Sequence, residues 1–320
     1  MWAESARLIR VRRIVRVRVV QAWLLSVTVL AGCASSPPEP ACDLRGVVPS
    51  EAGVGIRYGQ GVLWRVEREG APPSHVFGTM HAKDPEVTRL AEPVATQFAG
   101  ARSLAVEVLQ ISAAARTYGR AIQIPEGNLE LLIGPERMRL VKEAGARYGM
   151  PEGQLRRLKP WVLSVLFSMP PHEVRDGRPT LDQALEQSAQ ARAVPVYGLE
   201  TIEEQIDAYD RLDLGRQIEL LDAALAENRR IGCWWEQVVK DSYLRRDTGT
   251  LYALMAEQMA DDDVLWRALI GDRNLRMVER MEDRLVEGNA FVAVGAAHLP
   301  GDLGLLSLLE ARGYRISRIY

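Results

Sequence analysis

The chain has 320 residues, of which 47% are hydrophobic and 26% are charged, and its formal net charge at pH 7 is −2. This balance is typical of a globular protein and excludes disordered and collagen-like chains. The first 33 residues hold six Arg and one acidic residue, so removing them from the 40 basic and 42 acidic residues leaves 34 and 41, a net charge of −7. No basic run is present in that remainder, and nucleic acid is therefore not an expected partner.

The N-terminal segment predicts export. Six arginines between Arg7 and Arg18 precede a short apolar run over residues 19–30, and small residues follow it. A basic start, a short apolar run and small residues are typical of a secretory signal peptide, and the run is too short to span a membrane comfortably. The alternatives are a plain signal peptide without lipidation and an uncleaved anchor.

The sequence Leu30-Ala31-Gly32-Cys33 resembles a bacterial lipobox, which implies that Cys33 becomes the lipidated first residue of the mature protein. We therefore expect a lipoprotein signal peptide over residues 1–32, and the lipidated Cys with a tether over residues 33–56. The resemblance implies a periplasm-facing protein of the bacterial cell envelope, held to the membrane by its lipid anchor. Ala34 after the Cys favours the outer membrane.

The chain contains three cysteines. If Cys33 is lipidated, Cys42 and Cys233 remain, and two thiols in an oxidising compartment could form a disulfide. The alternative is that both stay unpaired.

The later part of the chain predicts strands and helices in alternation. Strands are expected over 61–66, 74–77 and 103–109, with a helix over 88–98, and the middle of the chain is mostly helical with a short strand over 194–200. A long helix or a bent pair over 263–287, a strand over 291–295, a helix over 303–312 and a strand over 314–319 follow. We expect an α/β fold over residues 57–320, with a central mixed sheet, flanking helices and a helical insertion over about 111–250 that could cap the sheet edge.

One short motif, Gly-x-x-His at the end of an apolar run, occurs twice. Gly78 ends an apolar run and is followed three residues later by His81, and Gly295 and His298 repeat this spacing. Ligands of open α/β sheets bind beyond the carboxyl ends of the strands, so the two imidazoles could converge on one site. Imidazole is a common metal ligand and a common base. The alternative is a His that caps a turn or bonds the backbone.

Three further residues are candidates for the same site. Glu107 lies near the end of an otherwise apolar strand, where a carboxylate is costly unless it is paired or metal-bound, so it could be a ligand or a general base. The alternative is a Glu that has just reached solvent. Asn274 extends the apolar stripe of the long helix by one turn, which indicates a cap or a site group, and Arg273 could bind a carboxylate or an oxyanion.

The remaining histidines and one glutamate are expected to have structural roles. His75 lies in the middle of a strand, and His172 lies in a Pro-Pro-His-Glu loop. Glu200 also ends a strand, but Thr201 and the helix after it favour a capping role. Signatures of P-loop NTPases, serine hydrolases and thermolysin-like proteases are missing from the sequence.

In this order the motifs resemble those of the TraB/GumN family, also called TIKI-like. The matching motifs are Phe77-Gly78-Thr79-Met80-His81, Glu107 in its strand, Lys159-Pro160-Trp161, Gly198-Leu199-Glu200-Thr201, Arg273-Asn274 and Val294-Gly295-Ala296-Ala297-His298. The family often has a Gly two residues before the Asp that corresponds to Asp182, and this chain has Thr180 there, so we assign Asp182 no role at this stage.

The resemblance implies a fold like that of the ChaN haem-binding and erythromycin-esterase-like proteins. It also implies a metal-dependent, peptidase-like hydrolase acting on a peptide or small-molecule substrate. In that hypothesis His81, Glu107 and His298 bind Mn²⁺, Co²⁺ or Zn²⁺, the metal activates a water, and Arg273 and Asn274 stabilise the oxyanion. The alternative is a non-catalytic module of ChaN type that binds haem or another ligand.

Overall fold

A six-stranded sheet forms the centre of the molecule, with the strand order β4-β3-β5-β2-β1-β6. The computed structural model describes residues 52–109, 119–125, 128–259 and 262–320. The strands are β1 (Leu63–Glu67), β2 (Ser74–Thr79), β3 (Ser103–Val108), β4 (Val196–Glu200), β5 (Ala290–Gly295) and β6 (Arg315–Arg318). The four strands β4, β3, β5 and β2 run parallel, whereas β1 is antiparallel to both β2 and β6. The expected α/β fold with a mixed sheet is confirmed.

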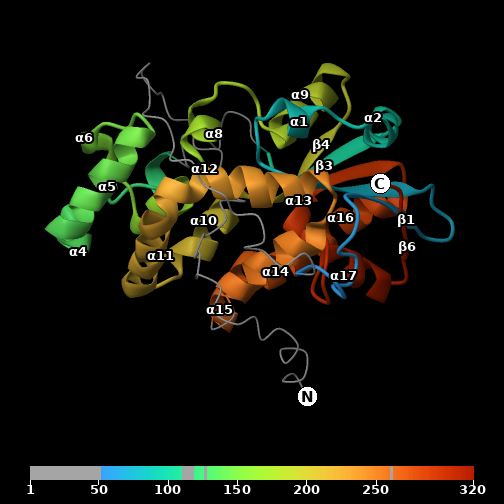
Figure 1. Ribbon diagram of the computed structural model, residues 1–320. Helices are drawn as coiled ribbons and strands as arrows, with labels where there is room; N and C mark the ends of the chain where they lie inside the picture. Colours follow the sequence, from blue (N-terminus) through green and yellow to red (C-terminus); the bar gives the residue numbers. More distant parts are fainter. Residues whose placement is uncertain (1–51, 110–118, 126–127, 260–261) are drawn as a thin grey trace.

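Helices surround this sheet (Figure 1). In the first half of the chain they are α1 (Pro85–Thr88), α2 (Glu92–Ala99), α4 (Leu129–Ile133), α5 (Pro135–Arg147), α6 (Glu152–Leu155), α7 (Pro160–Phe167), α8 (Pro171–Arg175) and α9 (Leu181–Ala191). After β4 follow α10 (Ile202–Asp210), α11 (Leu214–Glu227), η2 (Asn228–Arg230), α12 (Ile231–Trp234), η3 (Trp235–Lys240), α13 (Asp241–Leu244) and α14 (Thr248–Gln258). The last are α15 (Asp263–Trp266), η4 (Arg267–Gly271), α16 (Asp272–Glu287), η5 (Ala296–His298) and α17 (Leu305–Ala311).

The two faces of the sheet are covered by different helices because neighbouring strand residues point to opposite faces. Phe77, Leu104 and Phe291 belong to a large core with α2, α9 and the helices of the middle of the chain. A neighbouring residue of each strand points the other way: Val76, Ala105 and Val292 pack against apolar residues of α16 and α17. The sheet is therefore buried on both sides, which explains why its parallel strands are almost continuously apolar.

Two expected helices differ in detail from those observed. The helix expected over 88–98 is two short helices, α1 and α2, and each has a Pro in its first turn. Pro fits the first turn but disfavours a helix interior, so Pro93 starts a new helix and does not extend the previous one. The segment over 263–287 is helical throughout, and η4 forms a wider π-helical turn between α15 and α16.

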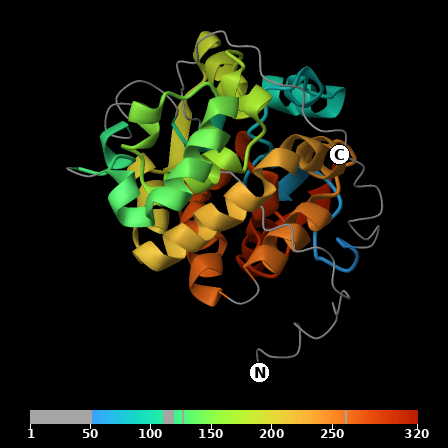
Figure 2. The ribbon, with the colours of Figure 1, turned by 60° about the vertical axis from the view of Figure 1, so that its left-hand side comes forward.

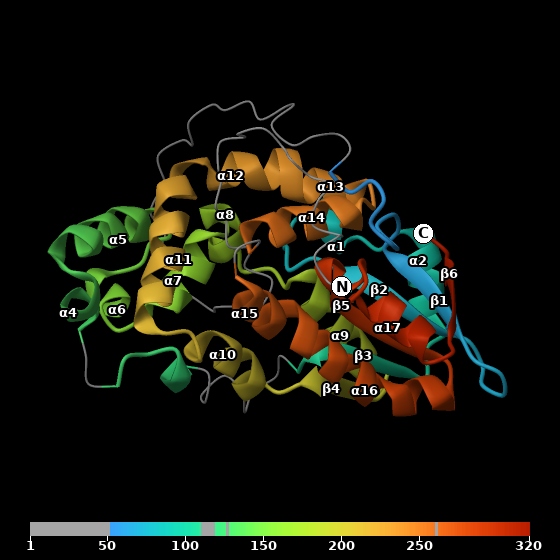
Figure 3. The same cartoon turned by 90° about the horizontal axis from the view of Figure 1, so that it is seen from below.

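The middle of the chain contributes both to the sheet and to a separate group of helices. The strand β4 comes from within the range 111–250 and adds to the sheet beside β3, and α9 packs against β3. Helices α4, α5, α6 and α11 lie at the end of the molecule opposite β1 and β6 in Figures 1 and 3. Figure 2 is rotated so that this end of the molecule, with the green helices, comes forward. The division into a domain with a helical insertion stays a prediction.

The expectations for the N-terminal segment fall on residues 1–51, so the signal peptide, Cys33, Cys42 and most of the tether lie outside the described residues. Cys233 is disulfide-bonded. Its pairing with Cys42 stays a prediction. Within the described residues, none of the helices combines the length and the apolar character that a membrane span requires.

Candidate active site

The carboxyl ends of the four parallel strands meet at one edge of the sheet and gather the polar residues there. Thr79 at the end of β2 lies in register with Gly295 at the end of β5, and Val108 at the end of β3 lies in register with Glu200 at the end of β4. His81 follows β2 and His298 follows β5, while Glu107 and Glu200 are themselves strand residues. The parallel topology thus brings together residues from positions 81 to 298 of the chain.

The two Gly-x-x-His turns pack against each other at this edge. A Cβ atom built on Gly78 would lie 2.8 Å from Cδ1 of Leu299 and 3.0 Å from Cα of Ala296. Real Cβ atoms essentially never approach that closely, so the second turn leaves no space for a side chain at position 78. The glycine of the first motif is therefore needed for the contact between the two motifs.

His81 is held by a carboxylate from α9. Nδ1 of His81 and Oδ2 of Asp182 are 2.5 Å apart, and the other oxygen of Asp182 accepts a hydrogen bond from the Thr79 hydroxyl at 2.5 Å. The side chain of His81 is 11% exposed and that of Asp182 is 7% exposed. Among the described residues, Nε2 of His81 has no hydrogen-bond partner.

Burial by itself lowers the pKa of His81, but the charge and hydrogen bond of Asp182, with a contribution from Glu107, raise it to about 9. The imidazole is therefore protonated at neutral pH.

Arg273 lies at the centre of the buried part of the site and is 1% exposed. Its Nε and Nη2 donate to Oε2 of Glu200 at 2.8 and 2.6 Å, and Nη2 also donates to Oε2 of Glu107 at 3.0 Å. Its Nη1 lies 3.2 Å from the Leu269 carbonyl oxygen and 3.2 Å from Nε2 of His298. These contacts engage all three nitrogens of the guanidinium.

The position of Arg273 follows from the wide turn η4 that precedes it. The carbonyl of Leu269, which belongs to η4, accepts a hydrogen bond from the guanidinium of Arg273 itself. Wide turns of this type shift the residues that follow them around the helix axis and are frequent at functional sites. The turn thus directs the side chain at the start of α16 inward, beneath the strand ends.

Glu107 is buried among these groups at 5% exposure. Its Oε1 accepts a hydrogen bond from the Gly295 backbone N–H at 2.5 Å, and its Oε2 accepts from Arg273. Burial raises the pKa of Glu107, but His298, Arg273 and His81 outweigh burial and lower it to about 2. The carboxylate therefore stays ionised across the physiological pH range.

His298 is neutral and fixed in one orientation. Nδ1 of His298 lies 2.6 Å from Oδ1 of Asn274, an acceptor, so Nδ1 carries the proton and donates it. The Asn274 amide nitrogen donates in turn to the backbone carbonyls of Leu303 at 2.7 Å and His298 at 3.4 Å. Burial lowers the pKa of His298 to about 3, although Glu107 acts in the opposite direction.

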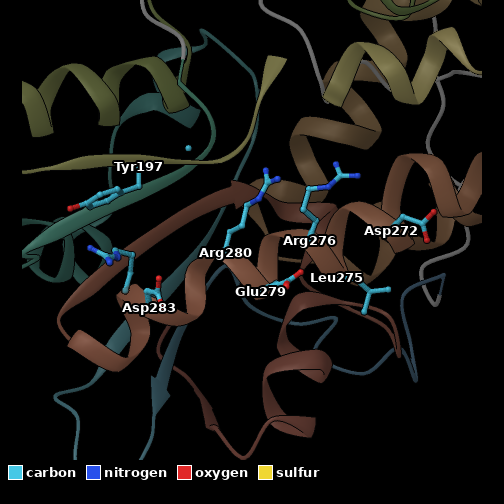
Figure 4. A pocket seen from close by; sticks show the side chains of 9 residues that line it. Tyr197, Asp272, Leu275, Arg276, Glu279, Arg280 and Asp283 are labelled. Carbon is cyan, nitrogen blue, oxygen red and sulfur yellow. The ribbon is translucent and has the colours of Figure 1, made fainter. Parts of the chain in front are cut away.

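A line of ion pairs runs from this buried site to the surface. Oε1 of Glu200 accepts a hydrogen bond from Arg276 at 2.9 Å, and Arg280 pairs with Glu204 at 2.7 Å. A surface groove of about 790 Å³ lies here between β4 and α16, and Figure 4 shows Arg276 and Arg280 extending from α16 in the same direction. Acidic residues of α16 also line the groove, so it has no strong charge of one sign.

A family model described as the TraB/PrgY/gumN family matches residues 62–318, which include every residue of the site. The chain belongs to the TraB/PrgY/gumN family. Among curated proteins of Danio rerio, Metalloprotease TIKI1 is 22% identical in an alignment that covers 79% of this chain and 62% of that protein. Metalloprotease TIKI2 is 24% identical in an alignment that covers 79% of this chain and 60% of that protein. The chain thus spans about three fifths of the length of these relatives. No solved structure matches it significantly.

The names of these relatives imply a metal, and the site of this TraB/PrgY/gumN chain does not fit one in the arrangement observed. The lone pair on Nε2 of His298 faces an N–H of Arg273, and both oxygens of Glu107 already accept hydrogen bonds. Nε2 of His81 carries a proton at neutral pH, because the pKa of this imidazole is about 9. The described residues contain no group of three or more His, Cys, Asp or Glu side chains placed to hold an ion. A cation at this position would have to displace Arg273.

The structure gives Asp182 and Glu200 contacts that the sequence did not suggest. Asp182, to which the sequence gave no role, orients His81. Glu200 does not cap α10, since Thr201 and Glu204 form that capping box, and it binds Arg273 instead. The sequence offered one indication that Glu200 belongs to the site: like Glu107, it lies at the end of a strand. His75 lies in β2 outside the site, and His172 is exposed with Glu236 3.7 Å away.

Proposed function

We propose that this chain is a hydrolase of an amide or ester bond and that its active site is the cluster formed by His81, Asp182, Glu107, Arg273 and His298. The observation that carries the proposal is the paired His81–Asp182 at the carboxyl edge of the parallel strands, with one imidazole nitrogen not used by the protein. A histidine oriented by a carboxylate is a widespread proton-transfer device in hydrolases. The names of the TIKI relatives support the class of reaction.

In the proposed reaction, water attacks the carbonyl carbon of the substrate. Nε2 of His81 takes a proton from that water while the new C–O bond forms, and it returns the proton to the leaving nitrogen or oxygen as the old bond breaks. Asp182 holds the ring through Nδ1 and stabilises the imidazolium that forms in between. Because the pKa of His81 is about 9, the neutral base becomes more abundant as the pH rises from 7 to 9.

The other residues of the cluster hold the geometry. Arg273 balances the buried charges of Glu107 and Glu200 and donates to His298, and Asn274 fixes the tautomer of His298. The sequence suggested that Arg273 and Asn274 stabilise the substrate oxyanion. Their donors are turned toward protein acceptors, so in this proposal both act as positioning residues and do not contact the oxyanion.

The test is cleavage of a peptide library by the wild type, by His81→Asn and by the control His172→Asn. We expect His81→Asn to lose activity at least about 100-fold, the usual contribution of a general acid–base group, and the exposed control to keep it. Unchanged cleavage in His81→Asn would remove the proposed mechanism.

The same assay decides the metal hypothesis. We expect activity to survive a chelator, because the described residues contain no group of three or more His, Cys, Asp or Glu side chains placed to hold an ion. Activity that requires added Mn²⁺, Co²⁺ or Zn²⁺, with a metal content lost in both His81→Asn and His298→Asn, would instead support the metal site expected from the family. A Soret band on adding haem, with no hydrolysis in any condition, would support a haem-binding module.

We also propose that the protein is anchored to the bacterial envelope through Cys33. The basic and apolar N-terminal run and the lipobox-like sequence before Cys33 support this. Labelling of cells with an alkyne fatty acid should mark the wild type but not Cys33→Ser. Equal labelling of the two proteins would refute the anchor.

A further inference from the structure

A second wide π-helical turn, η3, lies in the long helix formed by α12, η3 and α13, which runs across the molecule toward the sheet (Figure 1). The wide turn η4 precedes Arg273 and Asn274, which bind His298 of the second Gly-x-x-His motif. Turns of this type are frequent at functional sites. The residue that follows η3 and reaches the first Gly-x-x-His motif is Tyr243.

The hydroxyl of Tyr243 donates a hydrogen bond to the backbone carbonyl of Gly78 at 2.9 Å, and Tyr243 is 6% exposed. The neighbouring strand does not provide this bond. The Gly78 N–H donates to the Val62 carbonyl at 2.7 Å, but the Val62 N–H donates to the carbonyl of Tyr320 at 2.7 Å. Facing residues of such an antiparallel pair normally exchange both bonds, so the Gly78 carbonyl is left to Tyr243.

The bond from Tyr243 lies at the start of the segment that carries His81. Burial and the negative charge of Asp182 raise the pKa of Tyr243, so its hydroxyl stays protonated and able to donate. Asp182 itself binds the hydroxyl of Thr79 and the ring of His81. The segment from Gly78 to His81 is therefore held at its start by Tyr243 and further along by Asp182.

The helix that carries Tyr243 is also attached to the chain after His81. Lys240, the last residue of η3, has a side chain that is 11% exposed, and its Nζ donates to Oδ2 of Asp84 at 2.8 Å. The same ammonium pairs with Glu236 one turn earlier in the helix. One helix thus fixes the backbone three residues before His81 and a side chain three residues after it.

We propose that Tyr243 is a positioning residue of the active site, whose hydrogen bond to the Gly78 carbonyl fixes the turn that presents His81 to Asp182. Without this bond the peptide group between Gly78 and Thr79 can rotate, and the His81 ring loses its alignment with the carboxylate. Lys240 supports the same arrangement from the other side of His81. The inference rests on the proposed hydrolase function for its effect on catalysis, whereas its effect on the His81–Asp182 pair is measurable without a substrate.

The test compares Tyr243→Phe with the control Tyr148→Phe. Tyr148 is also fully buried, and its hydroxyl also donates to a backbone carbonyl, that of Met169 at 2.7 Å. It lies at the end of α5, in the group of helices away from the strand ends. Each substitution keeps the ring and removes a buried hydrogen bond to a carbonyl, so both should lower the melting temperature by a similar amount.

The first readout is the proton NMR signal of the hydrogen bond between Nδ1 of His81 and Asp182, which is identified by its loss in Asp182→Asn. A proton held in a charge-assisted bond of this kind gives a signal at low field. We expect Tyr243→Phe to shift this signal toward higher field or to broaden it beyond detection, because the pair loosens. Tyr148→Phe should leave the signal in place.

The second readout is the kinetics of peptide cleavage. The kcat of Tyr243→Phe should fall about 10- to 100-fold with little change in KM, which is the effect of a misplaced catalytic group, and Tyr148→Phe should change neither. If Tyr243→Phe does not fold, Lys240→Met tests the same attachment and should move the NMR signal and kcat in the same directions. An unchanged signal and kcat in that variant would then overturn the proposal.

The two readouts separate this inference from the proposed function. A shifted signal in Tyr243→Phe, with no cleavage of any peptide by the wild type, would keep the positioning role and reject the hydrolase. An unchanged signal and kcat in Tyr243→Phe, with cleavage that depends on His81, would keep the hydrolase and reject the positioning role. That role is also rejected if Tyr148→Phe moves the signal or lowers kcat as much as Tyr243→Phe, since the effect would then be a general loss of stability.

Discussion

Replacement of Arg273 by Met tests the electrostatic centre of the molecule. The substitution keeps a long apolar side chain but removes the positive charge between Glu107 and Glu200, which are 5% and 3% exposed. Breaking a buried ion pair by removing one partner typically costs about 3–5 kcal/mol, because the other charge stays buried and unpaired. Arg273 is one of several groups that lower the pKa of Glu107, after His298 and together with His81.

The assay is urea unfolding of Arg273→Met and of the control Arg280→Met at pH 7 and pH 5. Arg280 lies two turns further along the same helix and pairs with Glu204 near the surface, where the side chains are 39% and 27% exposed. A surface pair of this kind contributes about 0–1 kcal/mol. We therefore expect the free energy of unfolding to fall several times more in Arg273→Met than in Arg280→Met.

The destabilisation caused by Arg273→Met should depend on pH in a defined direction. In the wild type the folded pKa of Glu107 lies below its unfolded value, so its contribution is present above pH 4.5 and is lost as the pH falls through about 2. Without Arg273, burial raises the pKa of the Glu107 carboxyl, and the variant loses stability as the pH rises. The cost of Arg273→Met should therefore be smaller at pH 5 than at pH 7. Equal costs at the two pH values, or a cost no larger than that of Arg280→Met, would refute this account.

Two further predictions concern the histidine motifs. The folded pKa of His81, about 9, lies above the ordinary 6.5, so its contribution of about 3 kcal/mol is complete below pH 6.5 and is lost as the pH rises through 9. Chemical unfolding at pH 7 and pH 9.5 should show this loss in the wild type and a much smaller one in Asp182→Asn; parallel curves for the two proteins would contradict it. Gly78→Val should cost about 1–3 kcal/mol in thermal unfolding because its side chain meets Ala296 and Leu299, whereas Gly177→Val, where a Cβ has open space and the backbone φ is not positive, should cost much less. A cost at Gly78 no larger than at Gly177 would show that the two turns can separate freely.

Much of the fold could be predicted from the sequence because it depends on local patterns. The apolar runs ending at Gly78 and Gly295 are strands that are buried on both faces, and their period and composition are visible without coordinates. The helix α9 begins directly after Thr180, which forms a capping box with Gln183, so its start depends on a local pattern. The two Gly-x-x-His motifs also predicted correctly which edge of the sheet collects polar groups.

The partners of these groups could not be predicted, because they depend on which helix covers which strand end. Asp182 meets His81 only because α9 packs against β3 beside the end of β2, and Glu200 meets Arg273 only because the turn η4 directs the first residues of α16 inward. The sequence by itself determined the strands, the carboxyl edge and the residue types available there. The tertiary structure decided that a guanidinium lies among the carboxylates, since charges far apart in the chain interact strongly only when packing removes water from between them.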